Sequence, residues 1–256
     1  MNDENLREIH NNGFTLIRDA VDSANVDILM RACQRALEID DQVERARSSR
    51  GHVYAARNLL DVVPEIQTFW QQGILLDSLK LVLGDAIGLV RVLFFDKPPD
   101  RTWALPWHKD TAIAVKDNSG ASESFSRPTV KAGVPHVVAC DEVLRQMLTL
   151  RLHLDEVTDE NGPLRVIPGS HVSVESDGVG VENAVAIHAA VGDVLAMRPL
   201  ITHSSGSSHP GTTRHRRILH LEFAACRELP DGYQWHDFVE PAKQRDASRD
   251  LIGTGE

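Results

Sequence analysis

The chain is poor in cysteine and in aromatic residues, and it carries no excess of positive charge. Its 256 residues include 3 cysteines, aromatic residues make up 5%, and the formal net charge is -10. An acidic chain lacks the diffuse basic surface that collects a phosphate backbone through counterion release. Basic and aromatic residues are not interleaved in the way that binds single-stranded bases. We therefore expect no nucleic-acid partner.

The few cysteines and the lack of long apolar runs exclude two further classes. Cys33, Cys140 and Cys226 lie far apart and form no CxxC pair, so they predict buried free thiols in a reducing compartment rather than a disulfide framework. No apolar run approaches the roughly 20 residues of a membrane helix, and the first residues, MNDENLREIHNNG, show no signal-peptide pattern. We expect a cytoplasmic protein with no membrane partner.

Length and composition favour one folded domain. A chain of 256 residues with 42% hydrophobic and 25% charged residues is typical of a globular protein with a sizeable core. We predict a single domain over residues 1–256, with mostly helical support in 1–87, a β core in 88–226 and a polar tail in 227–256. The oligomeric state is not predicted.

The N-terminal third combines one strand with helical patterns. GFTLIRDAV alternates like a strand, and Ser23 then stands where a helix N-cap belongs, ahead of apolar residues at helical spacing. A second helical pattern begins at Pro64 and stops near Gly84.

From about residue 88 the pattern changes to short β-type runs. They include IGLVRVLFF, TAIAV, MLTLRLHLD, LRVIPG, AVAIHAA, DVLAMRP and RILHLEFA, separated by turn signals such as ENGP and VGD. Many short strands of this kind predict a sandwich or barrel. We expect a mainly β protein, a double-stranded β-helix of the jelly-roll, cupin-like type backed by the N-terminal helices.

The segment PWHKD raises the possibility of a metal site. Residues two apart on a strand point to one face, so His108 and Asp110 would project side by side while Trp107 and Lys109 point away. Alone, the pair fits a solvated strand face better than a metal site.

A third potential ligand changes that balance. His203, in MRPLITHSS, follows a predicted strand 95 residues after His108, which leaves room for the intervening strands to bring it back. Two imidazoles and one carboxylate leave three adjacent coordination positions open, which suits non-haem Fe(II) oxygenases. Zinc would accept the same ligands.

A basic run after His203 offers a possible anion anchor. A strand beginning near Arg214 would place Arg214 and Arg216 on one face. An inward arginine could hold the distal carboxylate of 2-oxoglutarate in a bidentate pair. An exposed cationic strand end is the alternative reading of this run.

Several of these segments together resemble the phytanoyl-CoA dioxygenase family of Fe(II)- and 2-oxoglutarate-dependent oxygenases. The similarity covers roughly residues 12–224, and its most specific parts are KPP…WHKD, LDEVTDENGPLRVIPGSH, GDVLAMRPLITHSS and RRILHLEF. The resemblance implies that His108, Asp110 and His203 bind the iron. It also implies that Arg216 anchors 2-oxoglutarate, with Arg214 as the alternative, and that Ser205 contacts this co-substrate.

Two further residues are weaker candidates for the co-substrate pocket. Arg91 lies 17 residues ahead of His108, where the resemblance implies a polar side chain facing co-substrate or substrate; a surface salt bridge is the alternative. His153 would share a face with Arg151 and Asp155, and it could line the pocket or be structural.

The resemblance implies Fe(II) as cofactor and 2-oxoglutarate and O2 as co-substrates. The predicted reaction hydroxylates an unactivated C-H bond of a small organic molecule and releases succinate and CO2. Asp110 favours hydroxylation, or a desaturation or ring formation of the same class, over halogenation, because a carboxylate ligand occupies the position that a halide would need. A jelly-roll protein that binds a metal or ligand without catalysis is the alternative, and a nucleic-acid repair oxygenase fits the acidic charge less well.

Residues 117–135, which follow the first two ligands, are rich in Ser, Gly and Pro. They are too long for an ordinary connection, and we predict either a poorly ordered loop or a mobile lid over the pocket mouth.

Overall fold

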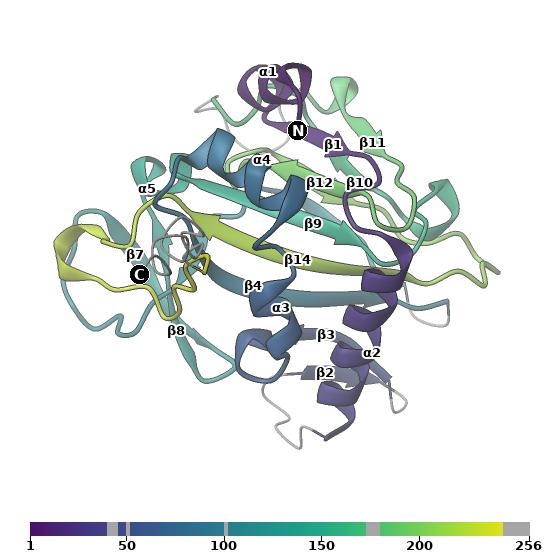
Figure 1. The fold of residues 1–256 in the computed structure, drawn as a ribbon, viewed down its shortest axis with the longest axis horizontal. Helices are drawn as coiled ribbons and strands as arrows, with labels where there is room; N and C mark the ends of the chain where they lie inside the picture. Colours follow the sequence, from purple (N-terminus) through teal and green to yellow (C-terminus); the bar gives the residue numbers. More distant parts are fainter. Residues whose placement is uncertain (40–45, 50–51, 100–101, 173–179, 243–256) are drawn as a thin grey trace, which may run out of the picture.

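A computed structural model describes residues 1–39, 46–49, 52–99, 102–172 and 180–242 (Figure 1). Most of its strands lie in two antiparallel sheets, and a third, smaller sheet stands beside them. Five α-helices occur in the described residues: α1 (Asp3–Asn12), α2 (Ser23–Ile39), α3 (Pro64–Thr68), α4 (Gly73–Leu83) and α5 (Asp141–Arg145).

The largest sheet has seven strands and draws them from both ends of the chain. In spatial order they are β1 (Phe14–Ile17), β12 (Val194–Met197), β9 (Met147–His153), β14 (Arg216–Ala224), β4 (Gly88–Lys97), β3 (His52–Arg57) and β2 (Ala46–Ser49). The central pairs, β9 with β14 and β14 with β4, are antiparallel and nearly continuous in register.

A four-stranded sheet faces the large one and completes a jelly roll. Its order is β11 (Val185–Ile187), β10 (Leu164–Val166), β13 (His203–Ser205) and β5 (Leu105–His108). The two sheets share an apolar cluster, in which Leu195 and Met197 from the large sheet pack with Leu164 and Val166 from the small one. The predicted double-stranded β-helix is confirmed.

The third sheet lies beside the four-stranded sheet, and its strands follow β5 in the chain. Its strands are β6 (Ala112–Ala114), β8 (Val134–Ala139) and β7 (Phe125–Lys131), with β8 in the middle.

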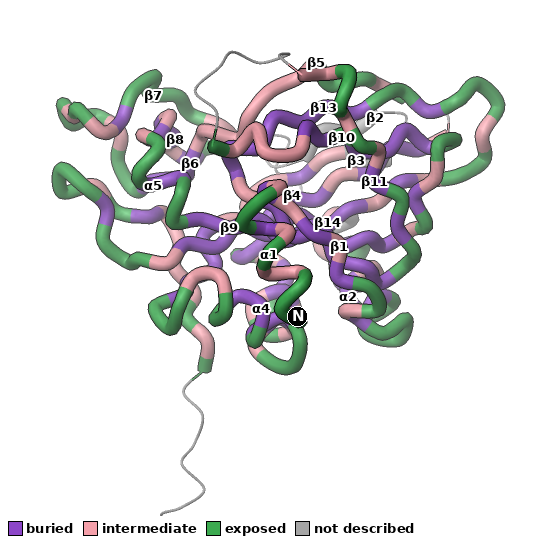
Figure 2. The backbone as a smooth tube through the Cα atoms, turned by 90° about the horizontal axis from the view of Figure 1, so that it is seen from above, coloured by how far each residue is buried: buried purple, intermediate pink, exposed green. Residues whose placement is uncertain are grey.

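Helices α2, α3 and α4 cover one face of the large sheet. The apolar side chains of α2, α3 and α4 pack in one cluster with alternate residues of β9, β14 and β4. Trp70 meets Phe223 of β14 edge to face, with ring centroids 5.0 Å apart. In Figure 2 the helices α2 and α4 lie below the strands β9 and β14, whereas β5 and β13 lie above them.

Two of our expectations about the N-terminal third need correction. The single helical pattern from Pro64 to Gly84 is two helices, because Gln72 is extended and Gly73 has a φ of 59°, a value that favours glycine and interrupts a helix. Residues 1–87 also supply β1, β2 and β3, so this segment builds part of the sheet as well as supporting it.

Helix α1 was not expected. A reciprocal capping box between Asn2 and Asn5 begins it, and Gly13, with a φ of 84°, ends it. Both signals are readable in the sequence, but the helix has a weakly apolar face, with Ile9 as its one buried residue.

The segment 117–135 is not one irregular loop. Its second half forms β7 and the turn into β8, so Ser, Gly and Pro here accompany a hairpin. Pro128 stands where the register of β7 shifts between Ser126 and Thr129, as expected of a residue that cannot donate to a ladder. That the segment acts as a lid stays a prediction.

The described part of the C-terminal tail packs back on the sheets. Val239 pairs with Leu89, and Trp235, which pairs with Val115, is buried and donates its indole N-H to the carbonyl of Cys226. Residues 243–256 of the predicted tail lie outside the described residues.

The three cysteines are free, but they are not all buried. Cys33 is buried, Cys140 is half-buried and Cys226 is exposed, so the expectation of three buried thiols is wrong for Cys226, which follows the last strand. None of the described helices has the length and apolar character needed to cross a membrane.

Candidate metal centre and co-substrate pocket

The three predicted metal ligands come together on the small sheet. Strands β5 and β13 are neighbours, and His203 stands directly opposite His108 in their register. Asp110 follows the end of β5, and its backbone N-H donates to the carbonyl of Pro199 at 3.0 Å. One ligand atom from each of the three side chains lies within 4.8 Å of the other two, which is close enough for one ion to bridge them.

The hydrogen bonds of the two imidazoles orient them for metal binding. The Nδ1 atom of His108 lies 2.7 Å from the carbonyl of Pro106, and that of His203 lies 3.0 Å from the carbonyl of Ile201. A carbonyl only accepts, so each Nδ1 carries the proton and each Nε2 keeps its lone pair. These Nε2 atoms lie 3.8 Å and 3.5 Å from the oxygens of Asp110.

The electrostatics of the cluster favour the metal-binding protonation states. Burial acts to raise the pKa of Asp110, but the charges of His203, His220, His108 and Arg91 outweigh it and lower the pKa to about 2. Burial lowers the pKa of His203 to about 4, although Asp110 acts in the opposite direction. At neutral pH the site therefore presents a carboxylate and an unprotonated buried imidazole, the forms that bind a cation.

One side of the cluster remains accessible. The His203 side chain is 4% exposed, whereas His108 and Asp110 keep 35% and 27%. The pair in PWHKD is thus neither a fully solvated strand face nor fully buried, and it forms the accessible side of the candidate metal site.

Arg216 is the first residue of β14 and lies inside the molecule. Its side chain donates from Nη1 to the carbonyl of Gly162 at 2.8 Å, while Nε is buried without a partner among the described residues. Burial lowers the pKa of Arg216, and so does the nearby Arg151. A buried guanidinium with a spare donor and no carboxylate is an unfinished anion site.

Two further cationic side chains, Lys97 and Arg151, lie near Arg216. Lys97 pairs with Arg216 in the register of β4 and β14, is fully buried, and donates to the carbonyl of Gly206 at 2.6 Å. Burial, followed by the charges of Arg216 and Arg151, lowers the pKa of Lys97 to about 7. Arg151 is also buried, and its Nη1 lies 2.9 Å from Nδ1 of His220.

Ser205 adds a hydroxyl to the same wall as the ligands. It lies two residues after His203 on β13, so both side chains point to one face. The Ser205 hydroxyl is buried and has no partner within the part of the chain that the structure describes.

Of the weaker candidates, Arg91 and His153 lie inside and Arg214 does not. Arg91 forms a buried ion pair with Glu222 rather than a surface one. His153 is buried on the same face of β9 as Arg151, and burial lowers its pKa to about 4. Arg214 precedes β14, is exposed, and pairs with Glu156 and Glu160, so the structure does not bring it to the ligands.

Sequence reasoning missed Lys97 and Arg151. The signal that could have found them is a set of charged or polar residues at alternate positions in otherwise apolar strands. Arg91 and Lys97 lie at alternate positions of β4, as do Thr149 and Arg151 of β9. The register places both pairs on one face of the sheet, together with Arg216, His220 and Glu222 of β14.

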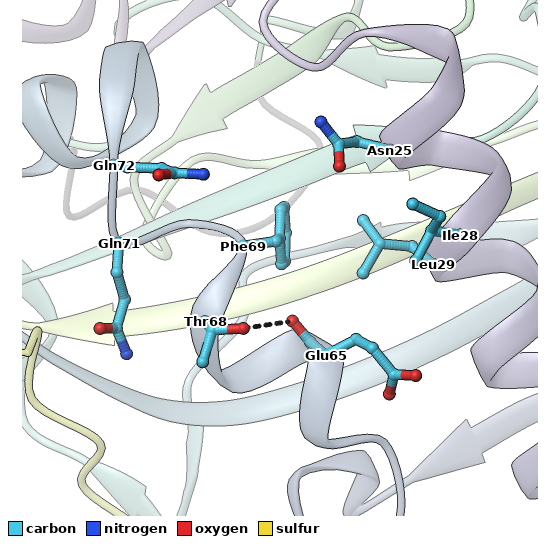
Figure 3. Close-up of a pocket in the computed structure, with 8 residues that line it drawn as sticks. All are labelled: Asn25, Ile28, Leu29, Glu65, Thr68, Phe69, Gln71 and Gln72. Atoms are coloured by element: carbon cyan, nitrogen blue, oxygen red, sulfur yellow. Dashed lines mark hydrogen bonds between the residues drawn. The ribbon is translucent and has the colours of Figure 1, made fainter.

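A separate cavity of about 440 Å³ lies among the helices (Figure 3). It is lined from α2 by Asn25, Ile28 and Leu29 and, from α3 onward, by Glu65, Thr68, Phe69, Gln71 and Gln72. It shares no residue with the metal cluster and brings together no group of metal-ligating side chains.

Comparison with known proteins places this arrangement in a family. A family model described as phytanoyl-CoA dioxygenase (PhyH) matches residues 9–216. Several solved structures share the fold. One is EctD from S. alaskensis, solved with 2-oxoglutarate and 5-hydroxyectoine, at a TM-score of 0.65 and 18% identity over 88% of this chain and 76% of that one.

Two further solved structures share the fold. SnoK, a non-heme alpha ketoglutarate dependent carbocyclase from nogalamycin biosynthesis, has a TM-score of 0.62 and 18% identity, covering 100% of this chain and 92% of its own. EvdMO1 has a TM-score of 0.62 and 20% identity over 86% of this chain, which spans only 49% of the EvdMO1 chain. The family match covers most of the sequence, and the chain belongs to the phytanoyl-CoA dioxygenase family of Fe(II)- and 2-oxoglutarate-dependent oxygenases.

Proposed function

We propose that this protein hydroxylates an unactivated C-H bond of a small organic molecule, with conversion of 2-oxoglutarate to succinate and CO2. The observation that carries the proposal is the buried Arg216, whose Nε has no partner among the described residues, on the large sheet that faces the His108, Asp110 and His203 cluster. A metal site alone fits many functions, whereas a metal site with an unfilled carboxylate anchor fits this reaction class.

The roles of the metal-binding residues follow from their orientation. His108 and His203 would hold Fe(II) through Nε2, since their Nδ1 atoms are held by backbone carbonyls. Asp110 would supply one carboxylate oxygen. Two imidazoles and one carboxylate leave three adjacent positions for co-substrate and O2.

Arg216 would bind the C5 carboxylate of 2-oxoglutarate, and the Ser205 hydroxyl would donate to the same co-substrate. The charges of Arg216 and Arg151 lower the pKa of Lys97, and that of Arg151 lowers the pKa of Arg216, so a bound dianion would relieve this repulsion. Fe(II) and 2-oxoglutarate, when bound, supply the oxidation with O2 that acts on a C-H bond. The protein orients both and keeps the buried end of the pocket dry.

Asp110 also bears on the type of reaction. Its carboxylate reaches both imidazole Nε2 atoms at 3.8 Å and 3.5 Å, so the coordination position that a halide would need is taken. This supports hydroxylation over halogenation.

Succinate release tests the proposal. With Fe(II), O2 and labelled 2-oxoglutarate, the wild-type protein is expected to form succinate slowly even without substrate, because such turnover needs only the metal and the co-substrate. Asp110→Ala removes a ligand and should lower the rate by on the order of 10³-fold, an expectation of about 4 kcal/mol at the barrier.

Arg214→Met is the matched control, since it removes a neighbouring guanidinium from the surface. Its rate should stay within about twofold of wild type, as expected of an exposed ion pair. A wild-type protein that binds Fe(II) and 2-oxoglutarate yet forms no succinate would favour the non-catalytic binding function instead.

A further inference from the structure

We propose that the substrate is an anionic small molecule whose carboxylate or phosphate group binds Lys131 and Arg91, at the opposite end of the interior from Arg216. This inference rests on the proposed function and names its substrate class. It is carried by unpaired buried donors, by the hairpin of β7 and β8, and by the charge balance of the interior.

The two ends of the interior are set by the register of the large sheet. Strand β14 runs from Arg216, opposite Lys97, to Glu222, opposite Arg91. Six residues of strand separate these ends, or about 20 Å. His220 lies between them on the same face of β14.

Buried polar atoms without partners among the described residues lie near Glu222, as they do near Arg216. Thr149 and Arg91 flank Glu222 on its two neighbouring strands. Arg91 donates from Nη2 to Glu222, but its Nε is buried and unpaired, and so is the hydroxyl of Thr149, among the residues that the structure describes. Buried donors without partners are rare in proteins and indicate a missing ligand or water.

The hairpin of β7 and β8 brings two more side chains to this end. It is tied to the large sheet by Asn58, whose side chain donates to the carbonyl of Ala132 in the turn at 3.1 Å. His136 pairs with Ala114 of β6, which follows Asp110 closely in the chain. Lys131, which precedes Ala132 in the chain, is half-buried, and burial lowers its pKa, as does the charge of Arg91.

His136 adds an acceptor to these donors. Its Nδ1 lies 2.9 Å from the carbonyl of Val134 and so carries the proton, while its Nε2 is buried without a partner in the described part of the chain. An imidazole in this tautomer accepts at Nε2. A substrate with a hydroxyl or amine next to its anionic group would satisfy both the donors and this acceptor.

The charge balance of the interior calls for an anion beyond the co-substrate. Fe(II) and 2-oxoglutarate carry two charges each and cancel one another. On the polar face of the large sheet and the hairpin beside it, the cations Lys97, Arg151, Arg216, Arg91 and Lys131 then outnumber the carboxylates Asp110 and Glu222. Because buried charges are costly unless paired, this excess within a protein of net charge -10 fits an anionic substrate.

Paramagnetic relaxation tests the proposal without knowledge of the substrate. The protein is loaded with Mn(II) and saturating 2-oxoglutarate, and the methyl proton relaxation of two small anions, propionate and methylphosphonate, is measured against the neutral propionamide. We expect Mn(II) to enhance the relaxation of at least one anion but not of propionamide. The anion with the larger effect distinguishes a carboxylate substrate from a phosphate one.

Two variants locate the site. Lys131→Met should weaken anion binding by at least about fivefold, as expected for loss of a charged partner. Thr149→Val should weaken it by about threefold without loss of stability, because its hydroxyl has no partner to lose in the part of the chain that the structure describes. Lys80→Met removes an exposed lysine of α4 and is the control for net charge; it should change nothing.

The proposal fails if neither anion is relaxed, if propionamide is relaxed equally, or if Lys131→Met binds the anions as wild type does. Failure to load Mn(II) and 2-oxoglutarate, measured beforehand, would instead remove the proposed function and this inference with it.

Discussion

The two faces of the central strands differ in what they bury. On β14, Leu219, Leu221 and Phe223 point toward the helices, whereas Arg216, His220 and Glu222 point toward the small sheet. Both faces are almost fully buried. One face is apolar and packed, and the other carries charges and hydrogen-bonding atoms, several of which have no partner among the described residues.

The difference teaches which part of the fold provides stability and which part provides function. Burial of apolar side chains contributes about 1.5–3 kcal/mol each to folding, and the helix-facing side supplies many of them. Buried charges cost free energy unless they are paired. The free energy gained by burying the apolar face therefore offsets the cost of burying the charged side chains of the other face.

The largest expected effect is a loss of stability on substitution of a residue in the apolar face. Phe223→Ala removes a fully buried ring that packs on Trp70, and it should lower the free energy of unfolding by about 3–5 kcal/mol. Chemical denaturation measures this change. A loss below about 1 kcal/mol would show that the helix-facing side does not dominate stability.

Arg216→Met should affect binding rather than stability. The affinity for 2-oxoglutarate with metal present should fall by about 30-fold or more, since a buried ion pair is lost. The free energy of unfolding without ligands should stay within about 1 kcal/mol of wild type or rise, because a buried cation without a carboxylate is removed. Calorimetry with and without 2-oxoglutarate separates the two effects, and a strongly destabilised variant with unchanged affinity would reverse our assignment.

A smaller effect should appear in the pH dependence of co-substrate binding. The pKa of Lys97 is lowered to about 7, mainly by burial, so above this pH the free folded protein loses the proton while the unfolded chain keeps it. Stability without ligand should therefore rise with pH from about 7 toward the ordinary lysine pKa. A bound dianion favours the protonated ammonium, so 2-oxoglutarate affinity should fall above pH 7, by at most about tenfold per pH unit.

Lys97→Met provides the control for this prediction. In that variant the affinity should be weaker at pH 7 and nearly flat above it. An equally steep pH dependence in wild type and variant would mean that another group takes up the proton.

The sequence predicted the fold, and it predicted that the three candidate metal ligands lie together, because both leave local signals. Alternation in runs such as MLTLRLHLD predicted the strands, and the order of His108, Asp110 and His203 indicated one site. Local sequence patterns could not show that Arg216 is buried and Arg214 exposed, since both share a strand parity and only the start of β14 separates them.

Lys97, Lys131 and His136 could not be assigned from local patterns for a different reason. Lys97 precedes two prolines that suggest a loop, and its burial depends on pairing with Arg216 across a register set by residues over a hundred positions away. The composition of 117–135 concealed the strand β7, so a hairpin that carries Lys131 was expected to be a loop. Contacts of this kind depend on tertiary packing.

The most direct test of the account is optical titration of the protein with Fe(II) and 2-oxoglutarate under anaerobic conditions. A weak visible charge-transfer band should appear in wild type and in Arg214→Met, should be absent in His203→Ala, and should need much higher 2-oxoglutarate in Arg216→Met. A band that is missing in wild type, or that persists unchanged in His203→Ala, would contradict the claim that this polar interior binds iron and its co-substrate.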